Sequence, residues 1–242
     1  MSKPRTLIGL ATPQANPTVE LEFRDMFSGN VLAVITRLTS RAATPEARLR
    51  AYFGQLRKAL ESFDTLPMAA FGFACTGSSY LVGPDREDEA TAELEAATGV
   101  PVITAAQAIR RELELRKARN IAVLAPYPLD LTGAAARYWA RLEIGITAIE
   151  RIALAGSDTR EIYTLTPAAG KKALSRIVTD DADLVLASGT GMPTLDLVCR
   201  QPLPCPLLSS NTCLAAELLR RAGVWPADRP LDAKRLSGSN SR

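Results

Sequence analysis

Eight short apolar runs recur along the chain, and stretches with a helical pattern lie between them. The runs are TLIGLAT, NVLAVIT, MAAFGFAC, PVIT, NIAVLAP, GITAIERIAL, DLVLASG and PLLSS. Intervening stretches such as PEARLRAYFGQLRKALESF and DEATAELEAAT have the periodicity of helices. This alternation is typical of parallel βα units, in which ligands bind at the carboxyl ends of the strands. The sequence therefore predicts an α/β fold with its chemistry in the loops that follow the apolar runs.

Segments of the first half of the chain recur in the second half in the same order. IGLATPQ starts at Ile8 and IAVLAPY at Ile121, an offset of 113, which also places Cys75 opposite Ser188. A third pair, PVITAAQAIRREL and PLLSSNTCLAAEL, matches at an offset of 105. We therefore expect two similar parallel-sheet βα halves, related by pseudo-twofold symmetry, with the site in the cleft between them.

The expected division of the chain follows from this repeat. Residues 1–118 form the first α/β half and carry Cys75, and residues 119–212 form the second half. Residues 213–242 form a C-terminal helix and tail, which could pack back on the first half.

Composition removes several classes of function. The chain has no histidine, so catalysis by an imidazole base and a zinc site are both excluded. The net charge of +3 is spread without a basic block, so nucleic acid is not an expected partner. No apolar run reaches the roughly 18 residues of a membrane span, and the N-terminus lacks the features of a secretory signal. We expect a cytoplasmic protein whose four cysteines are free thiols.

The candidate reactive residue is Cys75, at the end of the third apolar run. Thr76, Gly77 and Ser78 follow it, so the thiol is expected at a helix N-terminus, where backbone N–H groups converge. Such a position lowers a thiol pKa and provides a nucleophile or a proton carrier. The alternative is that Cys75 is a small buried hydrophobic residue.

The loops after other apolar runs offer groups that could bind an anion. The amide of Asn16 could hold a carboxylate or an enolate oxygen, or cap a turn before Pro17. Tyr127, held between two prolines, could donate to an anionic oxygen, or be an ordinary half-buried tyrosine. The loop 187–196 could bind a second carboxylate through backbone amides. Its candidate residues are Ser188, Gly189 and Thr190. Ser209, Ser210 and Asn211 could complete the rim or cap the last helix.

Five motifs, ATPQANPTVE, ACTGSSYLVG, LAPYPLD, SGTGMPTLD and PLLSSN, occur in this order. Together they resemble the aspartate/glutamate racemase superfamily, in its branch of maleate cis-trans isomerases and arylmalonate decarboxylases. The resemblance implies a closed site between two α/β halves, no cofactor and no metal. It also implies two cysteines on opposite faces of a small anionic dicarboxylate. Cys75 falls on the first cysteine, Asn16 and Tyr127 on carboxylate binders, and Thr76 and Thr190 on donors to an oxyanion.

The chain departs from this pattern at the second cysteine. Alignment on the family motif places Gly189 there, whereas the internal offset places Ser188 there. Racemisation needs an acid and a base on opposite faces, and neither residue supplies one at neutral pH. Addition of one thiolate to a double bond, followed by rotation and elimination, needs only Cys75. Decarboxylation of a malonate also needs only one proton donor.

The sequence thus predicts a cofactor-independent cis-trans isomerase of a small dicarboxylate, with Cys75 as the thiolate nucleophile. The alternatives are a decarboxylase of a substituted malonate, with Cys75 as the proton donor, and a dicarboxylate-binding protein without catalysis. Arg37 could steer the anion into the cleft. The identity of the substrate and the formation of a homo-oligomer stay open at this point.

Overall fold

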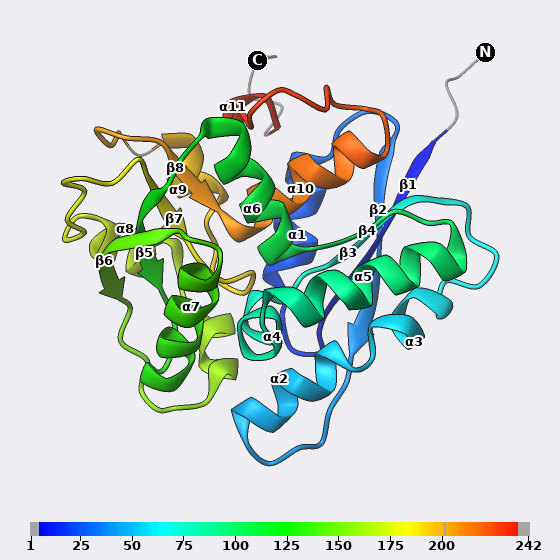
Figure 1. Ribbon diagram of the computed structural model, residues 1–242, viewed down its shortest axis with the longest axis horizontal. Coiled ribbons are helices and arrows are strands. Elements are labelled where there is room, and N and C mark those ends of the chain that lie inside the picture. Colours follow the sequence, from blue (N-terminus) through cyan, green and yellow to red (C-terminus); the bar gives the residue numbers. More distant parts are fainter. Residues whose placement is uncertain (1–4, 201, 237–242) are drawn as a thin grey trace.

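Two four-stranded parallel sheets form the framework of the protein. The computed structural model describes residues 5–200 and 202–236. The first sheet has the order β2-β1-β3-β4, and the second has the order β6-β5-β7-β8 (Figure 1). The strands are β1 (Thr6–Pro13), β2 (Val31–Leu38), β3 (Met68–Phe73), β4 (Val102–Thr104), β5 (Asn120–Ala125), β6 (Gly145–Arg151), β7 (Leu184–Ala187) and β8 (Leu207–Ser209). Each predicted apolar run contains one of them, and the two sheets share one topology, so the predicted α/β fold with two similar halves is confirmed.

Helices connect the strands and cover the sheets. They are α1 (Thr18–Met26), α2 (Pro45–Phe53), α3 (Leu56–Glu61), α4 (Thr76–Val82), α5 (Pro84–Thr98), α6 (Ala105–Arg116), α7 (Leu129–Arg141), the 3₁₀ helix η1 (Thr159–Thr164), α8 (Pro167–Leu174), α9 (Leu195–Arg200), α10 (Ser210–Arg221) and α11 (Ala233–Leu236). The long helical stretch predicted from residue 45 to 63 is two helices. The break lies at Gly54, whose low helix propensity makes it a favourable place to end α2.

The hydrogen-bond register shows which residues of the two halves are equivalent. The backbone N–H of Ala74 donates to Ala11 at 2.8 Å, and that of Ser188 donates to Leu124 at 2.9 Å. Each donor directly follows the last paired residue of β3 or β7. Cys75 therefore corresponds to Gly189, an offset of 114, as in the family alignment and not as in the internal offset.

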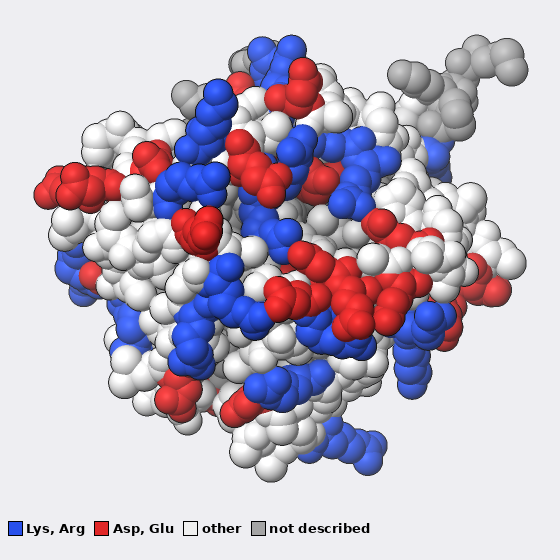
Figure 2. Space-filling view, viewed as in Figure 1, with Lys and Arg blue, Asp and Glu red and all other residues white. Residues whose placement is uncertain are grey.

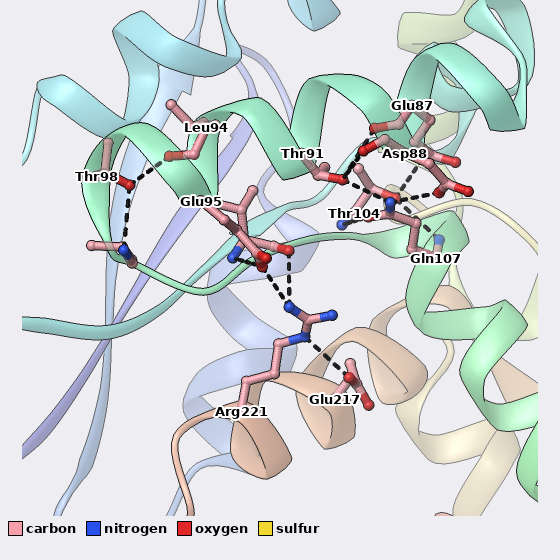
Figure 3. Close-up of polar contacts among 12 residues, drawn as sticks. Glu87, Asp88, Thr91, Leu94, Glu95, Thr98, Thr104, Gln107, Glu217 and Arg221 are labelled. Carbon is pink, nitrogen blue, oxygen red and sulfur yellow. Dashed lines mark hydrogen bonds and ion pairs between the residues drawn. The ribbon is translucent and has the colours of Figure 1, made fainter.

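Helix α10 follows the last strand of the second sheet and packs on the first half. It contacts α6, β3 and β4. A Cβ at Gly72 of β3 would lie 2.9 Å from Leu218 of α10, so a glycine is needed for this close approach. Arg221 of α10 bonds Glu217 at 3.1 Å and also bonds Glu95 of α5 (Figure 3). The predicted boundaries after residues 118 and 212 stay a prediction. The predicted C-terminal segment, residues 213–242, includes residues 237–242, which lie outside the described residues.

Charged side chains of both signs are interspersed on the surface. Figure 2 shows acidic side chains gathered over α5, with lysines and arginines around them. Opposite charges beside one another keep the local field weak. No helix among residues 5–200 and 202–236 has both the length and the apolar character that a membrane crossing requires.

Candidate active site

Cys75 connects β3 to α4 and lies at the N-cap of that helix. It is 5% exposed, and its Sγ lies 3.1 Å from the Ser78 hydroxyl. That hydroxyl donates to the carbonyl of Leu49 at 2.7 Å, so it is fixed against α2. Burial raises the pKa of the Cys75 thiol, although the Ser78 hydroxyl and the amides of Ser78 and Gly77 act in the opposite direction. The expected helix N-terminus is present, but the expected lowering of the pKa is wrong because desolvation outweighs it.

The Cys75 side chain borders a small cavity of about 30 Å³, built from both halves. Such a volume holds roughly one water molecule, so a four-carbon diacid can enter only if part of the wall moves. Six candidate residues line it: Cys75, Thr76, Gly77, Tyr127, Gly189 and Thr190. The remaining lining residues are Pro13, Leu49, Leu131, Thr159, Ile162, Tyr163 and Gly191. Because all of these are uncharged, an anion there must be held by hydroxyls and backbone amides.

Four buried hydroxyls form one continuous hydrogen-bonded chain beside this cavity. Thr76 Oγ1 lies 2.9 Å from Tyr127 Oη, and Tyr127 Oη lies 3.0 Å from Ser188 Oγ. Ser188 Oγ lies 2.9 Å from Tyr80 Oη. Burial raises the pKa of Tyr127, so its phenol is a hydrogen-bond donor and not a phenolate. Ser188 lies behind the cavity wall and contacts the two tyrosines.

The loop that carries Gly189 and Thr190 is fixed by polar contacts to both halves. The Gly189 amide donates to Ser210 Oγ at 2.9 Å, and Thr190 Oγ1 donates to the Ala74 carbonyl at 2.8 Å. Asn16 Nδ2 donates to Thr190 Oγ1 at 3.4 Å. Asn16 and Ser210 therefore lie behind residues of the wall and do not themselves line the small cavity.

Three other sequence expectations have a structural outcome. Asn16 Oδ1 accepts from the Thr18 amide at 3.0 Å, so the predicted turn before Pro17 is present alongside the contact to Thr190. Arg37 donates to the Asn16 carbonyl at 2.7 Å and pairs with Glu20 at 2.6 Å, so it fixes this loop instead of facing the cavity. Ser209, and not Ser210, caps α10 through a capping box.

Several residues at the site were not found from the sequence. Tyr80 follows Thr76 by four positions, so both lie on one face of α4, and this spacing was an available signal. Ile162 and Tyr163 come from η1, whose segment gives no comparable pattern. This helix is held by a salt bridge between Asp158, its N-cap residue, and the buried Arg48 of α2. This part of the cavity wall is thus tied to the opposite half.

A second, larger cavity of about 640 Å³ adjoins the first. Leu49, Leu131 and Thr159 line both cavities and form the partition between them. Tyr80, the end of the hydroxyl chain, also lines the larger cavity. Within the described ranges, no group of three or more cysteine or carboxylate side chains is arranged to hold a metal ion.

Comparison with known proteins identifies the family. Residues 8–235 match the family model of arylmalonate decarboxylase. The chain belongs to the arylmalonate decarboxylase family. The maleate isomerase of Geobacillus stearothermophilus is 23% identical over 228 residues, which cover 88% of this chain and 90% of that protein. The relatives of this chain are thus enzymes of the isomerase and lyase classes.

Solved structures of the family share the fold. A mutant of the maleate cis-trans isomerase of Nocardia farcinica superposes with a TM-score of 0.82 and 22% identity, covering 98% of this chain and 99% of that one. Arylmalonate decarboxylase superposes with a TM-score of 0.72 and 20% identity, covering 90% and 92%. At these identities the superpositions establish the architecture of two α/β halves.

Proposed function

We propose that the protein is a cofactor-independent cis-trans isomerase of a small unsaturated dicarboxylate of the maleate type, with Cys75 as the nucleophile. The observation that carries this proposal is the Cys75 sulfur on the wall of a small cavity that both halves build and that hydroxyls and amides surround. The maleate isomerase relative supports it. So does the N. farcinica structure, a mutant with a covalently bound succinylcysteine intermediate.

The reaction begins when η1 moves and water reaches the thiol. Solvation removes the penalty of burial, and the amides of Gly77 and Ser78 then favour the thiolate. The sulfur bonds to one alkene carbon while the π pair moves to the neighbouring carbon and into its carboxylate. Rotation about the new single bond and loss of the sulfur give the trans isomer and return the thiolate.

Neutral donors hold the two carboxylates in this proposal. Thr76 presents a hydroxyl to the cavity, and the loop amide of Gly77 lies beside it. The Thr190 hydroxyl and the Gly189 amide line the cavity too, but they already donate to the Ala74 carbonyl and to Ser210 Oγ. Tyr127 adds a phenol hydroxyl from the second half. Donors fixed by the fold stabilise the negative charge of the enediolate without reorganising during the reaction. Asn16 positions Thr190, and Ser210 positions Gly189.

Decarboxylation of a substituted malonate is the second candidate, because one observation favours it. Burial raises the pKa of Cys75 and so keeps the thiol protonated, which is the form that donates a proton to the enediolate left after loss of carbon dioxide. The apolar side chains of Leu49, Leu131 and Ile162 could face a substituent in the same cavity. The two candidates therefore need opposite protonation states of one sulfur.

The test incubates the protein with maleate and, separately, with phenylmalonate, and follows both by proton NMR. Cys75→Ser should abolish turnover, while Cys205→Ser, a half-buried cysteine outside the cavity, should leave it unchanged. Isomerisation should accelerate as pH rises toward the thiol pKa, whereas decarboxylation by the neutral thiol should slow. Turnover that survives Cys75→Ser would refute the role of this residue. Tight binding of both acids without turnover would instead indicate a dicarboxylate-binding protein.

A further inference from the structure

A phenol hydroxyl lies beside the place of the second family cysteine. Gly189 is the structural counterpart of Cys75, and an ideal Cβ built there would lie 3.1 Å from Tyr127 Oη. A side chain at residue 189 would therefore crowd the phenol of Tyr127. The Tyr127 hydroxyl and the Cys75 sulfur belong to residues that line the same small cavity, one from each half.

This hydroxyl is also connected to the larger cavity. Three hydrogen bonds of 2.9 to 3.0 Å link Thr76, Tyr127, Ser188 and Tyr80. These residues are 1 to 4% exposed, so the chain crosses the protein interior. Its first two members line the small cavity, and Tyr80 lines the larger one. A proton can therefore pass from the larger cavity to the reaction site while the partition stays closed.

We propose that Tyr127 donates a proton to the substrate on the face opposite Cys75, and that Ser188 and Tyr80 resupply it from the larger cavity. This rests on the proposed function. After the sulfur–carbon bond forms, the neighbouring carbon takes the Tyr127 proton, Tyr127 takes that of Ser188, Ser188 takes that of Tyr80, and Tyr80 takes one from water. The proton that Cys75 released to water on ionising balances the proton that water returns. The net change is addition of S and H across the double bond.

The concerted order of these transfers follows from the environment of Tyr127. Burial raises its pKa, so a free phenolate is disfavoured, and the phenol can donate only while Ser188 replaces its proton. Tyr127 therefore acts on the substrate, while Ser188 and Tyr80 act through Tyr127. The ring of Tyr138 contacts that of Tyr80, and the Tyr138 hydroxyl donates to Glu87, so Glu87 is not a member of the hydroxyl chain.

The isotope content of the product tests the proton donor. In D₂O the carbon beside the sulfur-bearing carbon gains deuterium from the face opposite the sulfur. After rotation, the hydrogen opposite the sulfur is the original one. Tyr127 takes this hydrogen while its own deuteron passes back through Ser188 and Tyr80 to water, the sulfur leaves as the thiolate, and the deuterium on carbon stays. Fumarate formed from maleate in D₂O should therefore carry one deuterium, and Tyr127→Phe should lower kcat about 100-fold, a typical effect of losing a general acid. Fumarate without deuterium would overturn the assignment of Tyr127.

Proton exchange of the Tyr127 hydroxyl tests the relay without any turnover. In protein labelled with [¹³Cζ]tyrosine in mixed H₂O and D₂O, the Tyr127 signal should be a single averaged line, because its hydroxyl exchanges quickly through Ser188 and Tyr80. Tyr80→Phe and Ser188→Ala should each resolve it into separate protonated and deuterated lines. Tyr52→Phe removes another buried phenol outside the chain and should leave the averaged line unchanged.

Two outcomes would overturn the relay. One is a resolved pair of lines already in the wild-type protein, and the other is an averaged line that persists in both Tyr80→Phe and Ser188→Ala. Absence of turnover with maleate and with phenylmalonate would refute the proposed function. The exchange measurement would still decide whether the proton relay exists, because it needs no turnover. If turnover is present, the two relay variants should slow kcat about 10-fold or more with KM nearly unchanged.

Discussion

Substitution of Gly189 by alanine should destabilise the protein through two separate effects. Its φ of +104° is a backbone conformation that residues with a Cβ rarely adopt, and holding it is worth about 1 to 3 kcal/mol of strain. The new Cβ would also lie 3.1 Å from Tyr127 Oη and 3.3 Å from Pro126 Cγ. Overpacking of a closed core adds about 1 to 3 kcal/mol. We expect the free energy of unfolding to fall by about 2 to 6 kcal/mol.

Gly99→Ala is the matched control for this experiment. Gly99 also has a positive φ, +69°, but a Cβ there would meet nothing within 4 Å. Its substitution should lower the free energy of unfolding by only about 1 kcal/mol, the backbone part of the effect. Urea denaturation of the two variants and the wild-type protein gives the comparison. Equal stability of Gly189→Ala and Gly99→Ala would refute the packing argument, and with it the competition between residue 189 and Tyr127.

Three further outcomes follow from the contacts and pKa shifts. The rate of alkylation of Cys75 by iodoacetamide, with Cys75→Ser as the blank, should rise with pH. It should reach half its maximum above pH 8.5, which is about the ordinary pKa of a thiol, because burial raises the pKa of Cys75. A midpoint near pH 7 would contradict this effect of burial. Glu22→Gln should lower the free energy of unfolding by about 1 to 3 kcal/mol, because the two carboxylate oxygens accept from the Thr194 amide and from Asn211 Nδ2, and glutamine can accept only one of these bonds. Unchanged stability in urea would contradict this. Arg220→Met removes one of the two arginines that pair with the buried Glu112 and leaves Arg116 at 3.4 Å, so it should cost about 1.5 to 3 kcal/mol in the same assay. Stability within about 0.5 kcal/mol of wild type would contradict the contribution of the buried pair.

The eight strands were predictable because buried parallel strands are continuous apolar runs, and each run is bounded by polar or small residues. The relation between the halves was predictable in outline only. The offset is 113 between β1 and β5 but 114 between β3 and β7, as the bonds from Ala74 and Ser188 show. The second half has one more residue between β5 and β7 than the first half has between β1 and β3. Comparison of short similar segments does not reveal such an insertion, because it lies outside the segments compared. The internal offset alone therefore places Ser188 opposite Cys75, whereas the family motif and the hydrogen-bond register both place Gly189 there.

The electrostatics of the site were less predictable than its position. The residues after Cys75 indicate a helix N-terminus, and α4 begins at Thr76. The sequence does not show how deeply Cys75 is buried. Burial raises the thiol pKa, whereas the helix N-terminus alone would lower it. The hydroxyl chain was hidden for a similar reason, because Tyr80, Tyr127 and Ser188 come from three separate segments. Their contacts depend on side-chain directions that follow from the packing of one half on the other.

Equal topology in the two halves does not give them equal chemistry. The first half supplies a sulfur at the end of β3, and the second supplies a glycine at the equivalent end of β7. The missing side chain at Gly189 leaves the volume that the Tyr127 hydroxyl occupies, and Ser188 beside it holds that hydroxyl in place. A Cβ at residue 189 would lie 3.1 Å from Tyr127 Oη, so a cysteine there requires the phenol to shift. A single substitution that restores the second thiol therefore also disturbs the hydrogen bond between Tyr127 and Ser188.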